Sequence, residues 1–421
     1  MNSNETIMEN NNNSCTPTLR FPRFTGEWVE KKFKDITFQA GKRNKRNLPY
    51  ERYSISNEVG FYPQSEQFED GGGYLKDIDC RQYIIVPPNS FAYNPARINV
   101  GSIGYQDLGK DVIVSSLYEV FQTKEDCDDS FLWQWFHTDI FHRMVVNVQE
   151  GGVRQYFYYD KLKDCTIFLP TLAEQQKIAS CLSELDNLIS AQNQKVEALT
   201  EKKKGLMRQM FPQPGETVPK LRFPGFTGDW EEKKLGKVFS RITRKNAENN
   251  QNVLTISAQY GLISQLDFFK KSVAAADVTG YYLLHKGEFA YNKSSSQGKP
   301  VGAIKPLKLY DKGVVSTLYI CFKCNDPKEI DFWEQYFDAG ILDNEIASIA
   351  QEGARNHGLL NIPTSGFFEL DVIVPALPEM QKIAGCLSAL DDSIAAEADK
   401  LETLKNHKKG LMQQLFPQPT K

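Results

Sequence analysis

The sequence predicts an α+β protein that consists of two similar domains and two long helices. Three pairs of blocks support this prediction: LRFPRFTGEW at 19–28 with LRFPGFTGDW at 221–230, LAEQQKIASCLSELD at 172–186 with LPEMQKIAGCLSALD at 377–391, and FPQP at 211 and again at 416. Blocks that return at such a distance indicate an internal duplication of a unit of roughly 200 residues. The 421-residue chain therefore holds two copies of one unit.

The interiors of the two copies match only in outline. The shorter matches between the two copies are FAYNP at 91 with FAYNK at 289, VSSLYEVF at 114 with VSTLYICF at 315, and QEGG at 149 with QEGA at 351. Around them, short β-branched and aromatic stretches are broken by glycine and proline, and each copy has one helix-like stretch, FLWQWFHTDIF or EIDFWEQYFDAG. Each copy is predicted to form a compact α+β domain.

The boundaries follow from these patterns. Residues 1–16 are rich in asparagine and are expected to form a disordered tail. The remaining segments are predicted to be a domain at 17–170, a central long helix at 171–212, a linker at 213–218, a second domain at 219–375, a C-terminal long helix at 376–416 and a tail at 417–421.

Start and stop signals define both long helices. Thr171 is predicted to be the N-cap of the first, with Glu174 completing a capping box, and Pro212 ends it. In the second helix Pro378 fits the first turn and Pro417 marks the end. Each helix has about 39 residues and is roughly 58 Å long at about 1.5 Å per residue.

Each helix repeats a 4-3 spacing over ten layers. In the first the layers are Ile178, Leu182, Leu185, Ile189, Gln192, Val196, Leu199, Lys203, Leu206 and Met210. In the second they are Ile383, Leu387, Leu390, Ile394, Glu397, Leu401, Leu404, Lys408, Leu411 and Leu415. A sustained 3.5-residue period predicts that the two helices form an antiparallel coiled coil, whereas helices that only pack on their own domains favour a wider 3.6-residue stripe.

The polar layers suggest a register for this coil. A parallel, unshifted pairing would set Lys203 against Lys408, which repel. An antiparallel pairing that sets Lys203 against Glu397 and Gln192 against Lys408 avoids this repulsion. In the alternative, both lysine side chains extend to solvent and do not specify a register. The predicted object has internal pseudo-twofold symmetry, with a similar domain at each end of a rigid spacer.

Composition limits the possible classes of protein. With 41% hydrophobic and 24% charged residues, the chain is typical of globular proteins, and no apolar run approaches the roughly 18 residues that a membrane helix needs. We expect a cytoplasmic protein without disulfides. The CxxC of Cys321 and Cys324 lacks a second ligand pair, so we expect no metal site.

Basic residues are clustered, although the net charge of -3 argues against a strongly nucleic-acid-binding chain. The clusters are GKRNKR at 41–46, SRITRK at 240–245 and NKSSSQGK at 292–299. Local clusters can contact phosphate while acidic surfaces elsewhere balance the total charge, or they can simply be solvated.

The repeated LRFPxFTGxW block, the two helix openings and the FPQP exits resemble the specificity subunit of type I restriction-modification systems. The resemblance covers residues 17–419. It implies two target-recognition domains, each reading one part of a bipartite site in double-stranded DNA. It also implies helices that hold the domains apart and dock two methyltransferase subunits, with endonuclease-translocase subunits completing the complex. Trp28 and Trp230 are then core anchors, since residues that read different sequences need not be identical.

Candidate DNA-binding residues are the Arg, Lys, Asn and similar polar side chains on glycine-bearing loops. In the first domain they are Lys42, Arg43, Lys45, Arg46, Tyr93, Asn94, Arg97, Arg154 and Gln155. In the second they are Arg241, Arg244, Lys245, Asn292, Lys293, Ser294, Ser295, Gln297, Lys299, Arg355, Asn356 and His357. For each of them, simple turn formation is the alternative.

Catalytic signatures are missing from the sequence. It has no GxxxxGK[ST] loop, and NPAR at 94–97 lacks the second proline and the aromatic residue of an adenine methyltransferase motif. We therefore expect no catalytic residues and no cofactor. Two other classes stay open: an unrecognised DNA-modifying enzyme, and a coiled-coil scaffold whose paired domains bind protein or glycan. Salt-sensitive DNA binding separates the scaffold from a DNA-reading protein.

Overall fold

The chain forms two compact units, and each long helix contributes to both of them. The structure, a computed structural model, describes residues 15–57, 60–66, 79–149, 156–257, 261–269, 277–295, 298–350, 358 and 360–417. Unit 1 comprises Met1–Gln192 and Lys400–Lys421, and unit 2 comprises Asn193–Asp399. The long helices are α5 (Leu172–Met210) and α11 (Leu377–Leu415).

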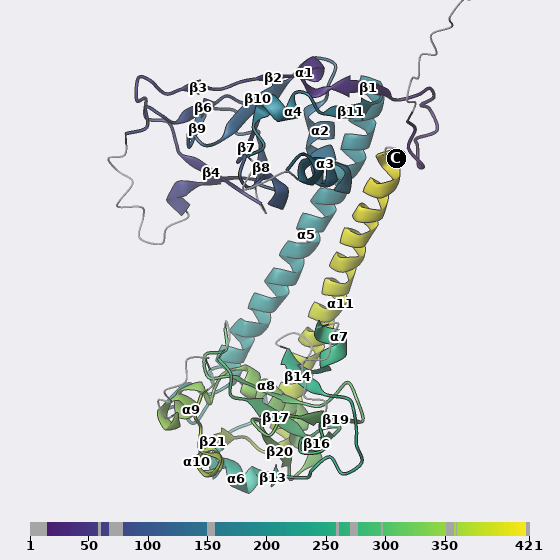
Figure 1. Cartoon of the computed structure of the whole chain (residues 1–421). Coiled ribbons are helices and arrows are strands. Elements are labelled where there is room, and N and C mark those ends of the chain that lie inside the picture. Colours follow the sequence, from purple (N-terminus) through teal and green to yellow (C-terminus); the bar gives the residue numbers. More distant parts are fainter. Residues whose placement is uncertain are drawn as a thin grey trace, which may run out of the picture. The chain divides into compact units, whose positions relative to one another are not determined.

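Unit 1 combines short strands with short helices (Figure 1). Its elements before α5 are β1 (Val29–Lys32), α1 (Phe33–Ile36), β2 (Thr37–Gln39), β3 (Lys42–Arg43), β4 (Tyr53–Ser56), β5 (Gly60–Pro63), η1 (Gln64–Glu66), β6 (Ile84–Val86), β7 (Ser90–Tyr93), η3 (Ile98–Val100), β8 (Ile103–Gln106), β9 (Val112–Val114), β10 (Glu119–Thr123), α2 (Asp129–Phe136), α3 (Asp139–Gln149), α4 (Tyr159–Leu162) and β11 (Thr166–Leu169). The main sheet has the antiparallel order β2-β10-β7-β8, and β3-β6-β9 form a second sheet.

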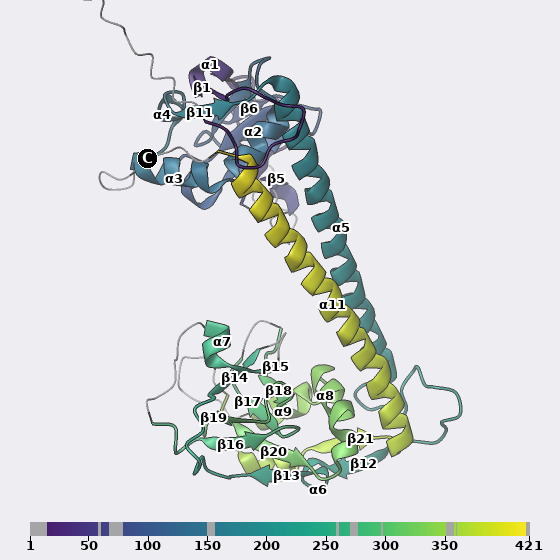
Figure 2. The same ribbon diagram turned by 90° about the vertical axis from the view of Figure 1, so that its right-hand side faces the viewer.

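Unit 2 has a similar succession of elements (Figure 2), although its described residues form no strand at the place of β3 and include an additional 3-10 helix, η4, before α8. Between α5 and α11 lie β12 (Glu231–Lys234), α6 (Leu235–Val238), β13 (Phe239–Ile242), β14 (Leu254–Ser257), β15 (Gly261–Ser264), α7 (Gln265–Phe269), β16 (Tyr282–His285), β17 (Phe289–Asn292), β18 (Ala303–Pro306), β19 (Lys312–Val315), β20 (Ile320–Cys324), η4 (Pro327–Glu329), α8 (Ile330–Asp338), α9 (Asp343–Ile349), α10 (Thr364–Phe368) and β21 (Asp371–Val374). Its main sheet, β13-β20-β17-β18, repeats the strand order of unit 1.

Matching aromatic pairs lie at the same place in both main sheets. Phe91 on β7 stacks on Phe121 of β10, with ring centroids 5.1 Å apart, and Phe289 on β17 stacks on Phe322 of β20 at 5.5 Å. All four rings are fully buried, which removes a large apolar area from water in each unit. The duplication seen in the sequence therefore extends to the packing of the core.

The repeated LRFPxFTGxW block fastens each unit to the start of a long helix. The Arg20 guanidinium donates to both oxygens of Glu174 on α5, at 2.8 and 2.7 Å, and Arg222 donates in the same way to Glu379 on α11, at 2.7 and 2.8 Å. These hydrogen bonds raise the pKa of both arginines, and both carboxylates are almost fully buried. The block is thus a structural clasp.

The clasp corrects one prediction and confirms another. The Glu174 carboxylate, expected to close a capping box with Thr171, instead faces Arg20 and accepts from the Trp28 indole at 3.4 Å. The ion pair with Arg20 is stronger than a bond to a single backbone amide. Trp28 and Trp230 are buried in the cores of their units, as expected for core anchors.

Inside each unit, the start of one long helix packs beside the end of the other. In unit 1, Ile178 and Leu182 of α5 share a core with Leu415 of α11 and with Phe416. In unit 2, Ile383 and Leu387 of α11 share a core with Met210 of α5 and with Phe211. The two helices therefore run in opposite directions within each unit.

The predicted register is wrong. Lys203 donates to Asp391, at 2.6 and 2.7 Å, and not to Glu397, which pairs with Lys195 at 2.9 Å. In unit 1, Lys408 donates to Asp186 at 2.6 Å. Asp391 and Asp186 each lie six positions before the residue predicted to face the lysine, so the alignment differs by nearly one heptad.

In each of these two ion pairs, the aspartate also accepts a hydrogen bond from a glutamine. Gln134 of α2 donates to Asp186 at 2.8 Å, and Gln335 of α8 donates to Asp391 at 2.8 Å. Both glutamines are buried. The same Gln-Asp-Lys group thus connects the short helix of each unit to both long helices.

The long helices are polar as well as apolar along their length. Over the part of the chain that the structure describes, no helix combines the length and the apolar character that crossing a bilayer requires.

Candidate nucleic-acid interface

A tight turn that carries the first basic cluster is built identically in both units. In unit 1 the buried Asn44 side chain accepts from the Leu48 amide and donates to the Leu48 carbonyl, both at 2.9 Å. In unit 2 the buried Asn246 does the same with Asn250, at 2.8 and 2.9 Å. The third residue after each, Asn47 or Asn249, is left-handed, with φ of 50° or 54°. Asparagine tolerates this conformation better than most residues.

The unit 1 turn presents four exposed cations. Lys42, Arg43, Lys45 and Arg46 all point into solvent from β3 and the turn after it. Arg43 donates to the Gln82 side chain at 2.6 Å, which fixes the guanidinium at the surface. The other three have the reach and the charge to contact phosphate.

The corresponding cations of unit 2 are more strongly tied to the protein. Arg244 donates to Glu288 at 2.5 Å, and Lys245 donates to the Gly280 carbonyl at 2.8 Å while lying 4.5 Å from the centre of the Tyr282 ring. Arg241 is exposed on β13. Where unit 1 has Lys45 and Arg46, unit 2 has Ala247 and Glu248.

The FAYN strands end in a second pair of matching turns. Asn94 accepts from the Ala96 amide at 3.0 Å, and Asn292 accepts from the Ser294 amide at 3.1 Å. These bonds use the asparagine oxygens to hold the backbone, so both residues act in turn formation. Arg97 follows the unit 1 turn and is exposed.

The unit 2 loop after Asn292 is held by backbone contacts. The Ser295 amide donates to the Gly358 carbonyl at 2.7 Å, and the Lys293 carbonyl accepts from Leu360 at 3.0 Å. Lys299 donates to the Asp338 carbonyl at 3.2 Å. Ser295 is exposed, and Lys293, Ser294 and Lys299 are half-buried.

The Tyr93 prediction is contradicted by burial. Its side chain lies in the core of unit 1 against Phe121, and burial raises the pKa of its phenol well above the ordinary value. Tyr93 lies on β7, which is buried on both faces, and it shares one face with Phe91 in the same core cluster. Tyr93 is therefore not part of the candidate DNA-binding surface.

Six predicted residues lie outside the part of the chain that the structure describes. They are Arg154, Gln155, Gln297, Arg355, Asn356 and His357. For these positions the assignment stays a prediction.

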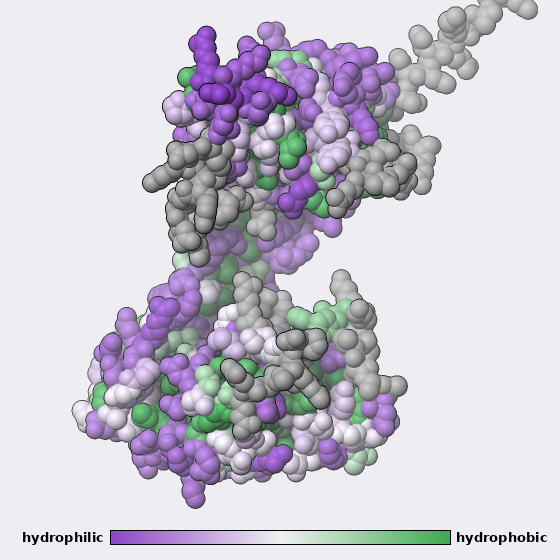
Figure 3. Space-filling model, turned by 60° about the vertical axis from the view of Figure 1, so that its left-hand side comes forward, coloured by the Kyte–Doolittle hydropathy of each residue, from purple (hydrophilic) through white to green (hydrophobic). Residues whose placement is uncertain are grey.

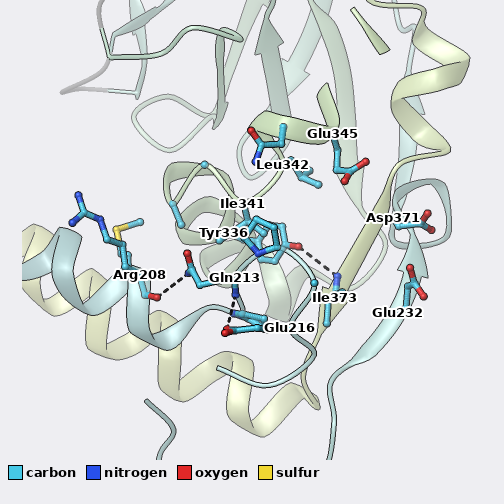
Figure 4. Close-up of a pocket in the computed structure, with 17 residues that line it drawn as sticks. Arg208, Gln213, Glu216, Glu232, Tyr336, Ile341, Leu342, Glu345, Asp371 and Ile373 are labelled. Carbon is cyan, nitrogen blue, oxygen red and sulfur yellow. Dashed lines mark hydrogen bonds between the residues drawn. The ribbon is translucent and has the colours of Figure 1, made fainter. Parts of the chain in front are cut away.

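One cavity of unit 2 carries a different chemistry from the basic turns. This cavity has a volume of about 390 Å³, and its lining residues include four carboxylates, Glu216, Glu232, Glu345 and Asp371, against one cation, Arg208 (Figure 4). Carboxylates repel phosphate, so this cavity is unsuited to a DNA backbone. In contrast, Figure 3 shows hydrophilic side chains over much of the upper face of unit 1.

The two cysteines of the CxxC stretch are packed into unit 2. Burial raises the pKa of the Cys321 thiol to about 12, and it has the same effect on Cys324. Thiols rather than thiolates are present at neutral pH, and a thiol is a poor metal ligand. Among the described residues no group of histidine, cysteine and acidic side chains is arranged to hold a metal ion.

Sequence comparison identifies the class of the first copy. Residues 25–201 match the family described as "Type I restriction modification DNA specificity domain". Over 186 residues the chain is 30% identical to the type I restriction enzyme MjaVIII specificity subunit of Methanocaldococcus jannaschii, a match that covers 42% of each protein. The chain spans about half the length of the curated relatives it matches.

Solved structures share the fold. The S subunit of a type I restriction-modification system from M. genitalium aligns with a TM-score of 0.56 at 12% identity, over 96% of this chain and all of that one. A chain from a study of complex assembly and conformational transition of the type I R-M system aligns with a TM-score of 0.53 at 13% identity, over 94% of this chain and all of that one. Residues 25–201 therefore match the type I restriction modification DNA specificity domain, and the chain as a whole shares the fold of these solved structures.

Proposed function

We propose that the chain is the DNA-binding specificity subunit of a type I restriction-modification complex, in which each unit reads one part of an asymmetric bipartite site in duplex DNA. The recognition domains are assigned to 17–170 and 219–375. One observation carries the proposal: the turns at Asn44 and Asn246 share one backbone but present different charged side chains. Two related domains that bind different DNA sequences are expected to share a backbone scaffold and to differ in the side chains on the DNA-binding surface.

The long helices are proposed to form an antiparallel coiled coil with a pseudo-twofold relation between its ends. Both are continuous over 39 residues, and the lysine pairings inside the two units follow one alignment. In this role the helices set the spacing of the two half-sites and dock two methyltransferase subunits. The chain itself is non-catalytic, and methylation and cleavage come from methyltransferase and endonuclease-translocase subunits.

Genome-wide methylation mapping tests the proposal. The chain is co-expressed with a type I methyltransferase subunit that forms a complex with it, and methylated adenines are mapped across the host genome. One asymmetric bipartite motif is expected. No motif, from a complex that assembles and binds its methyl donor, would overturn the proposal.

Salt dependence supplies a second test. DNA affinity of the purified complex should fall steeply as salt rises, because each lysine or arginine on a phosphate releases counterions. Retention of a protein or glycan partner without salt-sensitive DNA binding would favour the scaffold alternative.

A further inference from the structure

Two exposed tyrosines stack on each other at the surface of unit 1. The side chains of Tyr156 and Tyr158 are each 47% exposed, and their ring centroids lie 5.5 Å apart with 26° between the planes. Tyrosine offers a large rigid contact area together with a hydrogen-bonding hydroxyl, which is why it is enriched in binding surfaces. The pair is already ordered before any partner arrives, which lowers the entropic cost of binding.

A buried anchor between them fixes their position. Phe157 is buried in the unit 1 core, and its amide donates to the Pro95 carbonyl at 3.0 Å. Pro95 lies in the Asn94 turn, which leads directly to the exposed Arg97. The tyrosine segment therefore lies beside a turn of the candidate DNA surface.

Unit 2 repeats the anchor but not the tyrosines. The Leu360 amide donates to the Lys293 carbonyl at 3.0 Å, and Lys293 follows Asn292 as Pro95 follows Asn94. After the anchor comes Asn361 in unit 2 and Tyr158 in unit 1. A shared backbone contact with changed side chains is the same pattern that the Asn44 and Asn246 turns show.

The charge around the pair suits an anionic partner. Arg97 is exposed on the adjacent turn and forms no ion pair with a carboxylate among the described residues. The acidic residue next along the segment, Asp160, is neutralised by Lys163 at 2.5 Å. Duplex DNA offers sugar and thymine methyl surfaces to the rings and phosphate or base acceptors to the hydroxyls.

We propose that Tyr156 and Tyr158 contact the half-site that unit 1 reads, an inference that rests on the proposed function and names residues for it. Because tyrosine is uncharged, its contacts add affinity and sequence preference without releasing counterions.

The test compares salt slopes in the complex with methyltransferase. Tyr156→Ala/Tyr158→Ala should lower affinity for the cognate duplex by about 10- to 100-fold, with an unchanged slope of log K against log salt. Arg97→Ala should make that slope less negative by about one. Leu117→Ala, which removes another exposed hydrophobic side chain of unit 1, is the matched control and should match wild type.

Methylation mapping separates the possible outcomes. The double tyrosine variant should relax one half of the bipartite motif and leave the other half intact, and the two Tyr→Phe changes separate the hydroxyls from the rings. Wild-type affinity and motif in the double variant would overturn the inference alone. Loss of methyltransferase binding would also overturn it, because the pair would then dock protein. A wild-type complex that binds no specific site would remove the proposed function and this inference together.

Discussion

The turn after Asn44 in unit 1 and the turn after Asn246 in unit 2 have the same backbone hydrogen bonds but expose different side chains. The buried amides make the same pair of hydrogen bonds, yet unit 1 presents Lys45 and Arg46 where unit 2 presents Ala247 and a glutamate paired with Lys312. The duplication has kept what holds the chain in place and changed what faces solvent. Residues that are identical at matching positions of the two copies therefore indicate structural roles, and exposed residues that differ are candidates for DNA recognition.

The largest effect is expected at the clasp. Arg20→Ala leaves the Glu174 carboxylate buried without its cation, which should lower the free energy of unfolding by about 3 kcal/mol. Urea unfolding followed by tryptophan fluorescence measures the loss, and Arg222→Ala should lose a similar amount in unit 2. The control is Arg23→Ala, an exposed arginine of the same block. Equal stability of the Arg20 and Arg23 variants would show that the clasp is dispensable.

The helix pairing should give the next largest effect. Lys203→Asp places two carboxylates together, and a loss of about 2 kcal/mol is expected because Asp391 is partly solvated. Adding Asp391→Lys should restore most of the loss, whereas adding Glu397→Lys should not. Rescue by the Glu397 change instead would favour the register that the layers alone predicted. Thermal unfolding of the three variants decides between them.

Removing the buried asparagine side chain of either turn should lower the free energy of unfolding by a smaller amount, which should be similar in the two units. Asn44→Ala and Asn246→Ala each leave a backbone amide and a carbonyl unpaired, so each should lower the free energy of unfolding by about 1.5 kcal/mol. Asn246→Ala also removes a bond of 3.2 Å to the Val278 carbonyl, which still accepts from the Tyr281 amide. Lys45→Ala, on the same turn but exposed, should change it by less than about 0.5 kcal/mol. Clearly unequal losses at the two asparagines would break the framework interpretation.

Exchanging the surface of the turn should leave stability unchanged and alter only DNA binding. Lys45→Ala/Arg46→Glu gives unit 1 the side chains of unit 2, and affinity should fall about tenfold with a salt slope less negative by about two. Filter binding at several salt concentrations measures both quantities. Lys34→Glu, at an exposed lysine of α1, serves as the charge control. An unchanged slope in the double variant would remove this turn from the candidate interface.

The sequence was most informative where both copies agree. The identical tryptophans indicated core positions, and both are buried. It was less informative about partners distant in sequence. Nothing local shows that Glu174 meets Arg20, 154 positions earlier, rather than closing a cap.

The register failed for a related reason. The predicted register used the residues of the layers, whereas Asp391 and Asp186 lie directly after a layer leucine and accept from the lysines of the other helix. Long lysine side chains can span that offset. Burial was likewise hard to foresee for Tyr93, whose neighbours in sequence suggested a loop, whereas it ends a strand that is buried on both faces. The spacing of Asn44 and Asn47, repeated at 246 and 249, was a signal for the turn that composition alone does not reveal.

The division of the long helices has a consequence for how the protein is made. Leu415 and Phe416, near the end of the chain, complete the core of unit 1, whereas unit 2 is one continuous stretch, Asn193–Asp399. Domains generally fold in the order in which the ribosome releases them. Here the first domain to be synthesised is finished after the second, because its core stays open until Leu415 and Phe416 have left the ribosome. A chain truncated before Leu415 would therefore lose stability in unit 1, far from the site of the truncation in sequence.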